Sequence, residues 1–170
     1  MRTGLDPRFC NITYDSNALD SNDDQQHADV ERILELAETS EIILVTPKSV
    51  LSEIEHPNTP RQTRRAAMNQ IFTTHVGRTR QEHELEEKIR TVVRGNAKSG
   101  KHDADVSHLS EAAKYGGYFI TNDKRLIKKR EDLRNVLPPS LMIVTPSEFL
   151  EIYDHCAATR PPPSRLRRKE

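Results

Sequence analysis

The sequence is short of the residues that build several common kinds of protein. It has no Trp and only two Cys, and aromatic side chains make up 5% of its 170 residues. No apolar run approaches the roughly 20 residues that a membrane-spanning helix needs. The first ten residues contain no apolar stretch like that of a secretion signal. Cys10 and Cys156 are therefore expected to be reduced thiols, and the protein is expected to be cytoplasmic with no membrane partner.

Charged side chains are abundant, at 31% of residues, and they are unevenly placed although the net charge is zero. Residues 1–60 hold 12 acids and 4 bases, whereas residues 61–101 hold 4 acids and 10 bases. An acidic region followed by a basic one suits a cation site beside a phosphate-binding surface. The same charges are equally compatible with the solvated faces of surface helices.

Four short apolar segments predict strands, at residues 10–14, 41–46, 118–121 and 141–145. Apolar residues at helical spacing lie between them, and Thr145-Pro146-Ser147-Glu148 has the pattern of a capping box that opens a last helix. This alternation predicts one domain over residues 10–155, an α/β sandwich with a mostly parallel sheet. Residues 61–98 show no strand pattern and predict a helical arm of two helices, at 61–75 and 80–93. Residues 160–170 predict a disordered basic tail.

Acidic residues fall where the predicted strands end. Asp15 follows the first strand and Asp123 the third, while Glu53 lies about two turns into the helix after the second strand. Asp105 begins the helix that leads into the third strand. Since ligands of open parallel sheets gather at the carboxyl ends of the strands, these four carboxylates are expected to converge. Each one alone is also explained as a helix cap, a turn residue or a solvated helix residue.

Converging carboxylates would repel one another, and a divalent cation with oxygen ligands removes that cost. The sequence therefore predicts a Mg²⁺ or Mn²⁺ site that activates water and stabilises the charge on an attacked phosphodiester. A structural zinc site is disfavoured because no matching His and Cys cluster is present. An Asp-x-Asp phosphatase is disfavoured because position 17 is Asn, and a response-regulator receiver because no Lys follows the last strand.

The ordered set of acidic motifs resembles the PIN-domain family. Asp15-Ser16-Asn17-Ala18-Leu19 is similar to the family's opening motif, and Val50-Leu51-Ser52-Glu53-Ile54 to its second. The stretch from Asp105 to Thr121-Asn122-Asp123 resembles the third and fourth motifs together. In the family these consist of an Asp, an alanine-rich helix, a Gly, an apolar strand and then Thr-x-Asp. Order and spacing agree across residues 11–150.

The resemblance implies a three-layer α/β/α sandwich with a divalent-metal site that cleaves single-stranded RNA. It makes Asp15, Glu53, Asp105 and Asp123 the catalytic and metal-binding acids, with Asn17 and Thr121 as supporting polar residues. Asp103 is an additional acid that can share or replace the role of Asp105. The most similar group is that of VapC toxins, so an antitoxin protein and a second copy of the chain are candidate partners. The helical arm and the tail depart from the smallest toxins.

Several basic residues and histidines are candidates for contact with RNA or for proton transfer. The basic candidates are Arg61, Arg64, Arg65, Lys98 and Lys101, which are equally explained as solvated surface. His102 and His108 flank Asp105, and the plainer interpretation of each is a surface histidine. The alternative function is a PIN-fold interaction or scaffold module that binds metal without significant cleavage.

Truncation after Thr159 tests the role expected for the tail. Its five basic residues can neutralise phosphates, so truncation should leave the fold and cleavage intact but weaken RNA binding, more at low salt than at high salt. RNA affinity measured across a salt series checks this. An unchanged affinity and salt slope would leave the tail as a docking segment for a protein partner.

Overall fold

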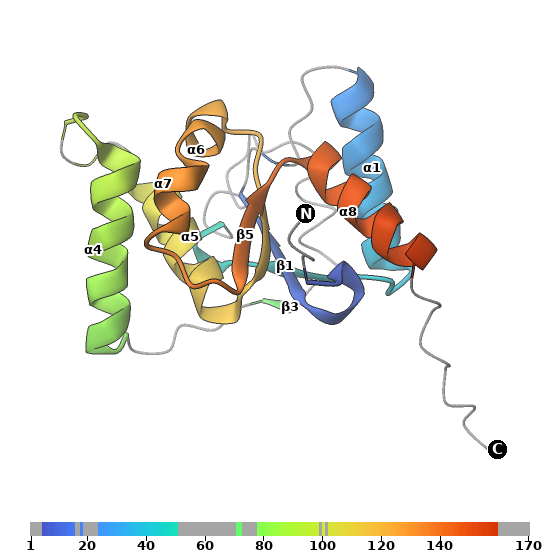
Figure 1. Ribbon diagram of the computed structural model, residues 1–170, viewed down its shortest axis with the longest axis horizontal. Coiled ribbons are helices and arrows are strands. Elements are labelled where there is room, and N and C mark those ends of the chain that lie inside the picture. The colour runs from blue at the N-terminus through green and yellow to red at the C-terminus, as the bar shows by residue number, and fades with distance from the viewer. Residues whose placement is uncertain are drawn as a thin grey trace.

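A computed structural model describes residues 5–15, 18, 24–50, 78–98, 100 and 102–159, together with the backbone of residues 71–72. The described chain is an α/β fold in which helices cover both faces of one sheet (Figure 1). The strands are β1 (Asn11–Tyr14), β2 (Ile43–Thr46), β3 (Ile71–Phe72), β4 (Gly117–Ile120) and β5 (Leu141–Val144). The helices are α1 (Asp24–Glu38), α4 (Arg80–Arg94), α5 (Asp103–Tyr115), α6 (Lys124–Lys128), α7 (Arg130–Arg134) and α8 (Pro146–Thr159), with a 3₁₀ turn, η1, at Pro7–Phe9.

The sheet has the strand order β3-β2-β1-β4-β5, and every pair of neighbouring strands is parallel. The prediction of four strands and a parallel sheet is confirmed, with strand ends shifted by one or two residues. The prediction that residues 61–98 hold no strand is wrong, because β3 adds to the outer side of β2. Two residues are too few for a recognisable period-2 pattern, so only pairing with β2 defines this strand.

Two apolar cores lie on opposite faces of the sheet, as the alternation of side chains along a strand requires. On one face, Ile12 and Tyr14 of β1 pack with α1 and α8. On the other, Phe119 of β4 packs with Ile89 of α4 and Leu109 of α5. The sheet is therefore buried on both sides, which explains why its strands are apolar almost throughout.

The second half of the expected helical arm belongs to a layer of the domain. Ile89 and Val93 of α4 are fully buried against α5 and its neighbours. Figure 1 shows α4 beside α5 and α7 on one side of the sheet, with α1 and α8 on the other. The predicted helix at 80–93 is present as α4, and its apolar stripe covers a core.

The helix boundaries follow from local chemistry. The predicted capping box is present at α8, where the Glu148 N–H donates to Thr145 Oγ1 at 3.2 Å and the Thr145 N–H donates to a Glu148 carboxylate oxygen at 2.9 Å. Gly116 ends α5 with φ +66°. The short helices α6 and α7 were not predicted, because five residues are too few to show a helical period.

Cys10 and Cys156 are free thiols, and burial raises the pKa of Cys10 to about 11. None of the helices in the described part of the chain combines the length and apolar character needed to cross a membrane.

Gly117 is expected to be irreplaceable in the sheet. Its φ is +86°, and a Cβ atom there would lie 1.9 Å from the Asn11 carbonyl oxygen of β1. Gly117→Ala combines a left-handed strain of roughly 1–2 kcal/mol with an overlap costing a similar amount or more. Gly100→Ala is the matched control, since φ is +81° there but nothing lies within 4 Å of the added Cβ. Urea unfolding should show a markedly larger loss for Gly117→Ala, and equal losses would contradict the close contact.

Candidate functional site

The strand order reverses direction at the carboxyl ends of β1 and β4. The chain passes from β1 to β2 on one side, while β4 lies on the other side of β1. In open parallel sheets this reversal of strand order leaves a crevice in which ligands bind. Asp15 follows β1 and Thr121 follows β4, so both stand at this point.

Asp15 forms the buried floor of the site, with only 2% of its surface exposed. The Thr121 hydroxyl donates to Asp15 Oδ2 at 2.5 Å, and the Ala18 N–H donates to Asp15 Oδ1 at 3.1 Å. The Asp15 N–H donates to the Ile120 carbonyl at 3.1 Å. These bonds fix the orientation of the carboxylate and offset part of the cost of burying it.

Thr121 connects Asp15 to the second acid of the site. It is fully buried, and its hydroxyl oxygen accepts a hydrogen bond from the Asp123 N–H at 3.0 Å. Asp123 in turn is the N-cap of α6, where its Oδ1 accepts from the Arg125 N–H at 2.7 Å. One hydroxyl therefore sets the relative positions of two loops that each carry a carboxylate.

Arg125 brings the third acid to the site. Its Nη2 donates to Asp123 Oδ2 at 2.9 Å and also to Asp105 Oδ2, in the first turn of α5. The guanidinium thus bridges two carboxylates that lie 18 residues apart in sequence. Sequence reasoning missed Arg125, although a base two residues after an N-cap Asp can turn back toward the carboxylate that caps its own helix.

The Arg125 guanidinium stays positively charged although it is partly buried. The Arg125 side chain is 28% exposed, and burial lowers its pKa below the ordinary arginine value. Arginine starts from so high a pKa that the side chain stays charged at neutral pH. Its Nη1 is buried and has no hydrogen-bond partner among the residues that the structure describes. The two carboxylates are therefore what holds this cation in place.

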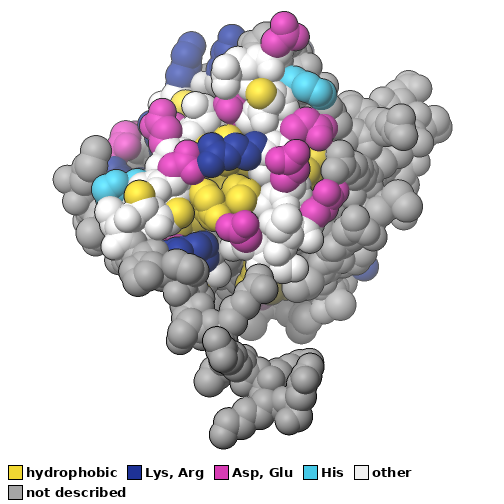
Figure 2. Space-filling model, turned by 90° about the vertical axis from the view of Figure 1, so that its right-hand side faces the viewer, with side chains coloured by type: hydrophobic (Ala, Val, Ile, Leu, Met, Phe, Trp, Pro, Cys, Tyr) yellow, Lys and Arg dark blue, Asp and Glu magenta, His cyan; other side chains and the backbone are white. Residues whose placement is uncertain are grey.

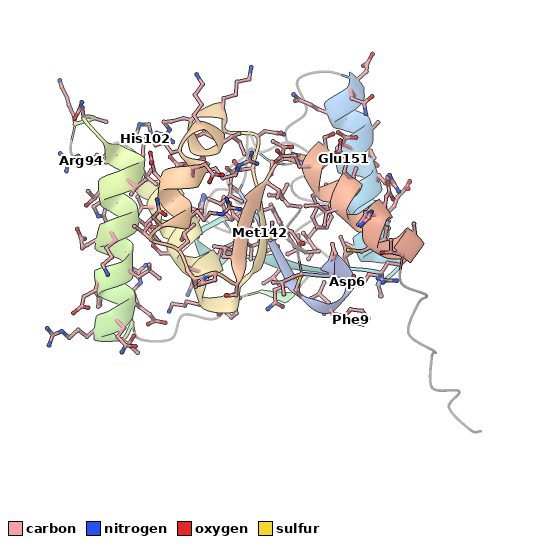
Figure 3. The ribbon with its side chains drawn as sticks, in the orientation of Figure 1. Asp6, Phe9, Arg94, His102, Met142 and Glu151 are labelled. Atoms are coloured by element: carbon pink, nitrogen blue, oxygen red, sulfur yellow. The ribbon has the colours of Figure 1, made fainter. Side chains whose placement is uncertain are left out.

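Asp103 and the two histidines lie around Asp105 in different settings. Asp103 is paired with Arg90 of α4 at 2.6 Å, and about half of its side chain is exposed, so its ion-pair partner differs from that of Asp105. His102 Nδ1 is 3.5 Å from Asp105 Oδ2, and Figure 3 shows His102 at the start of α5. The expectation of a surface position is wrong for His108, which is 2% exposed, since it lies on the inner face of α5.

The remaining predicted site residues are placed only in part. Lys98 is exposed shortly after the end of α4, and it forms no ion pair with another described residue. The others lie outside the described residues: Asn17, Glu53, Arg61, Arg64, Arg65 and Lys101.

The chemistry of the site suits a hard divalent cation. Asp15, Asp105 and Asp123 offer carboxylate oxygens, the ligands that Mg²⁺ and Mn²⁺ prefer. The Arg125 guanidinium already bridges Asp105 and Asp123, so this pair of carboxylates binds a positively charged group. Within the described residues, no three His, Cys, Asp or Glu side chains are close enough to form a metal site by themselves. A cation here would rely on one or two direct carboxylates and retained waters, as is usual for Mg²⁺.

No protein-family model matches the sequence, and no curated protein matches it. The function is therefore inferred from the motifs and from the geometry of the site.

Arg125→Gln is expected to destabilise the metal-free protein by about 1–2 kcal/mol, because it removes a partly buried ion pair and leaves Asp105 and Asp123 to repel each other. Arg134→Gln is the matched control, since Arg134 pairs with Glu131 at the exposed surface and should cost less than about 0.5 kcal/mol. Urea unfolding in the presence of a chelator measures both.

Addition of Mn²⁺ extends the same experiment. A cation that replaces the guanidinium should restore more stability to Arg125→Gln than to the unaltered protein. Equal losses in the two variants would show that the bridge contributes nothing, and equal Mn²⁺ effects would show that the cation binds elsewhere.

Proposed function

We propose that this protein is a divalent-metal-dependent endoribonuclease that cleaves single-stranded RNA. The observation that carries the proposal is the meeting of Asp15, Asp123 and Asp105 through Thr121 and Arg125 at the carboxyl edge of the sheet. These acids come from three separate segments. Their order along the chain is that of the PIN-domain motifs, which the sequence resembles.

The residues of the site have separable tasks in this proposal. Asp105 and Asp123 are the partly exposed acids, so they would contact the cation, while Asp15 supplies charge from the buried floor. Thr121 keeps Asp15 oriented and the loop after β4 in place. Glu53 is the fourth acid that the resemblance implies. A bound Mg²⁺ or Mn²⁺ would activate water and stabilise charge on the phosphodiester.

The substrate class follows from the resemblance and from the charge on the chain. Lys124 and Lys128 of α6, which follow Asp123 and are exposed, would attract the phosphate backbone whatever its sequence. The low aromatic content leaves little base stacking, which favours broad over sequence-specific recognition. The role of toxin in a two-component toxin–antitoxin module is a further part of the proposal that rests on the resemblance alone.

One observation favours the alternative, a PIN-fold interaction module without significant nuclease activity. Arg125 already neutralises much of the charge of Asp105 and Asp123, so these acids have a structural role without any metal. In such a module the acids would hold α5 to α6 and would not act on a substrate. The two functions differ in whether changing one acid abolishes a reaction or only alters stability.

Asp123→Asn should lower RNA cleavage by at least about 100-fold, because it removes a carboxylate at the proposed cation while Asn caps a helix as well as Asp does. Asp132→Asn on α7 is the matched control and should cleave normally, since Asp132 is exposed. Cleavage of single-stranded RNA is measured with Mn²⁺, with and without chelator.

The melting temperature of the same proteins, with and without Mn²⁺, separates the two functions. An enzyme should show metal-dependent cleavage and a Mn²⁺-induced rise in melting temperature, both reduced by Asp123→Asn. A rise without any cleavage supports the module. Cleavage by Asp123→Asn at the unaltered rate would remove this acid from the reaction.

A further inference from the structure

A cavity of about 430 Å³ lies next to the acidic site. Its walls come from the start of α1, from the residues on either side of Asp123, from α6 and from the start of α8. Its volume falls in the range of roughly 300–1,000 Å³ that is usual for small-molecule sites. Because β4 and β5 both end at this cavity, it occupies the same edge of the sheet as Asp15 and Asp123.

The cavity and the acidic site share a stretch of backbone. Asn122 and Lys124, the immediate neighbours of Asp123, both line the cavity. The Asn122 side chain donates to the Ala18 carbonyl at 3.2 Å, and the Ala18 N–H in turn donates to Asp15. A ligand in the cavity would therefore contact the loop that also positions Asp15 and Asp123.

The charges in the wall favour an anion. Lys124 and Lys128 lie one turn apart on α6, and both are exposed. Neither has an ion-pair partner in the part of the chain that the structure describes, unlike Arg125, which lies between them in sequence. Asp29 of α1 is the one acid among the described residues of the wall, and its Oδ1 accepts from Gln25 at 3.1 Å. Among the lining residues that the structure describes, two lysines and one aspartate therefore give a net positive charge.

The rest of the wall suits a partly apolar group that also carries polar atoms. Ile127 and Pro146 provide apolar surface, while Asn122, Gln26 and Ser147 provide amide and hydroxyl groups. A pocket of this kind, mostly apolar with a few polar groups, binds small organic ligands and orients them. A nucleotide has both features that such a wall would bind. Its phosphate suits the lysines, and its base suits the apolar surface of Ile127 and Pro146.

We propose that this cavity binds one nucleotide of single-stranded RNA, the unit adjacent to the bond that the acidic site cleaves. The proposal rests on the proposed ribonuclease function. Lys124 and Lys128 contact its phosphate, and the base enters the cavity. A base in a duplex is stacked and paired, so only an unpaired nucleotide can be accommodated in this way. The cavity thus selects single strands without reading a long sequence.

The test measures binding separately from cleavage. A short fluorescein-labelled single-stranded RNA is titrated with protein in excess chelator, across a salt series, and the matched RNA duplex is titrated in parallel. The double variant Lys124→Gln/Lys128→Gln removes the two charges. Lys88→Gln/Arg134→Gln is the matched control, because it removes the same charge from exposed positions on α4 and α7 outside the cavity. Ser147→Phe fills the exposed rim of the cavity without changing charge.

Lys124→Gln/Lys128→Gln should reduce the salt dependence of binding by about 0.7 in the log–log slope for each charge removed. The control double variant should keep the original slope. Ser147→Phe should weaken binding at an unchanged slope, and nucleoside monophosphates should displace the RNA at lower concentration than inorganic phosphate. Equal slopes in the two double variants, unaltered binding by Ser147→Phe, or equal binding of the duplex would each overturn the proposal.

Cleavage assays on the same proteins separate this proposal from the proposed function. If the unaltered protein binds single-stranded RNA through the cavity but never cleaves it with Mn²⁺, the nuclease assignment fails and the binding site stands. If it cleaves RNA while the cavity variants bind and cleave like the control, the nuclease assignment stands and the cavity is not a nucleotide site. Parallel melting curves confirm that each variant is folded.

Discussion

Three carboxylates at one edge of a sheet repel one another, and the site depends on how that repulsion is offset. Two kinds of bond do so in the described residues. Buried Asp15 is stabilised by neutral donors, the Thr121 hydroxyl and the Ala18 N–H. Asp105 and Asp123 are stabilised by the charge of Arg125. The first arrangement orients an acid without adding charge, whereas the second supplies positive charge, as a bound metal ion would.

In the proposed function, the Arg125 bridge would link stability to metal binding. A cation that binds Asp105 and Asp123 must compete with Arg125, so part of its binding energy is spent in releasing the guanidinium. Once released, the guanidinium is a positive group beside the proposed cleavage site, where a phosphate would attract it. The same side chain would then stabilise the protein without metal and contact the substrate in its presence.

The residues of the acidic site and of the cavity come from all three layers, the sheet and the helices on its two faces. α5 and α6, on one face of the sheet, carry Asp105, Asp123 and Arg125, while β1 contributes Asp15 from the middle layer. The helices of the other face, α1 and α8, supply the far wall of the cavity. Figure 2, seen from their side, shows acidic side chains around basic ones, and Arg32 of α1 pairs with Asp154 of α8. The cavity therefore lies where the two helical layers meet the carboxyl edge of the sheet.

Much of this architecture was predictable from local sequence. Buried parallel strands are apolar on both faces, so Ile12, Leu44, Phe119 and Ile143 mark their strands directly. The capping box at Thr145 and Glu148 and the glycine that ends α5 are likewise local signals. Asp15, Asp105 and Asp123 could be assigned to one edge because carboxyl ends of parallel strands lie together.

The rest depends on contacts between residues distant in sequence. β3 is a strand only through its pairing with β2, and α4 is part of the domain because Ile89 and Val93 meet α5. His108 is buried because it lies on the face of α5 that packs against the sheet. The residues next to it in sequence do not show which face of the helix is buried. Asp103 and Asp105 look equivalent in the chain, but Arg90 holds the first and Arg125 the second. Residue types and their order thus determined which chemistry this protein can carry, while the packing of helices on the sheet decided which charges meet, since electrostatic pairing depends on distance in space.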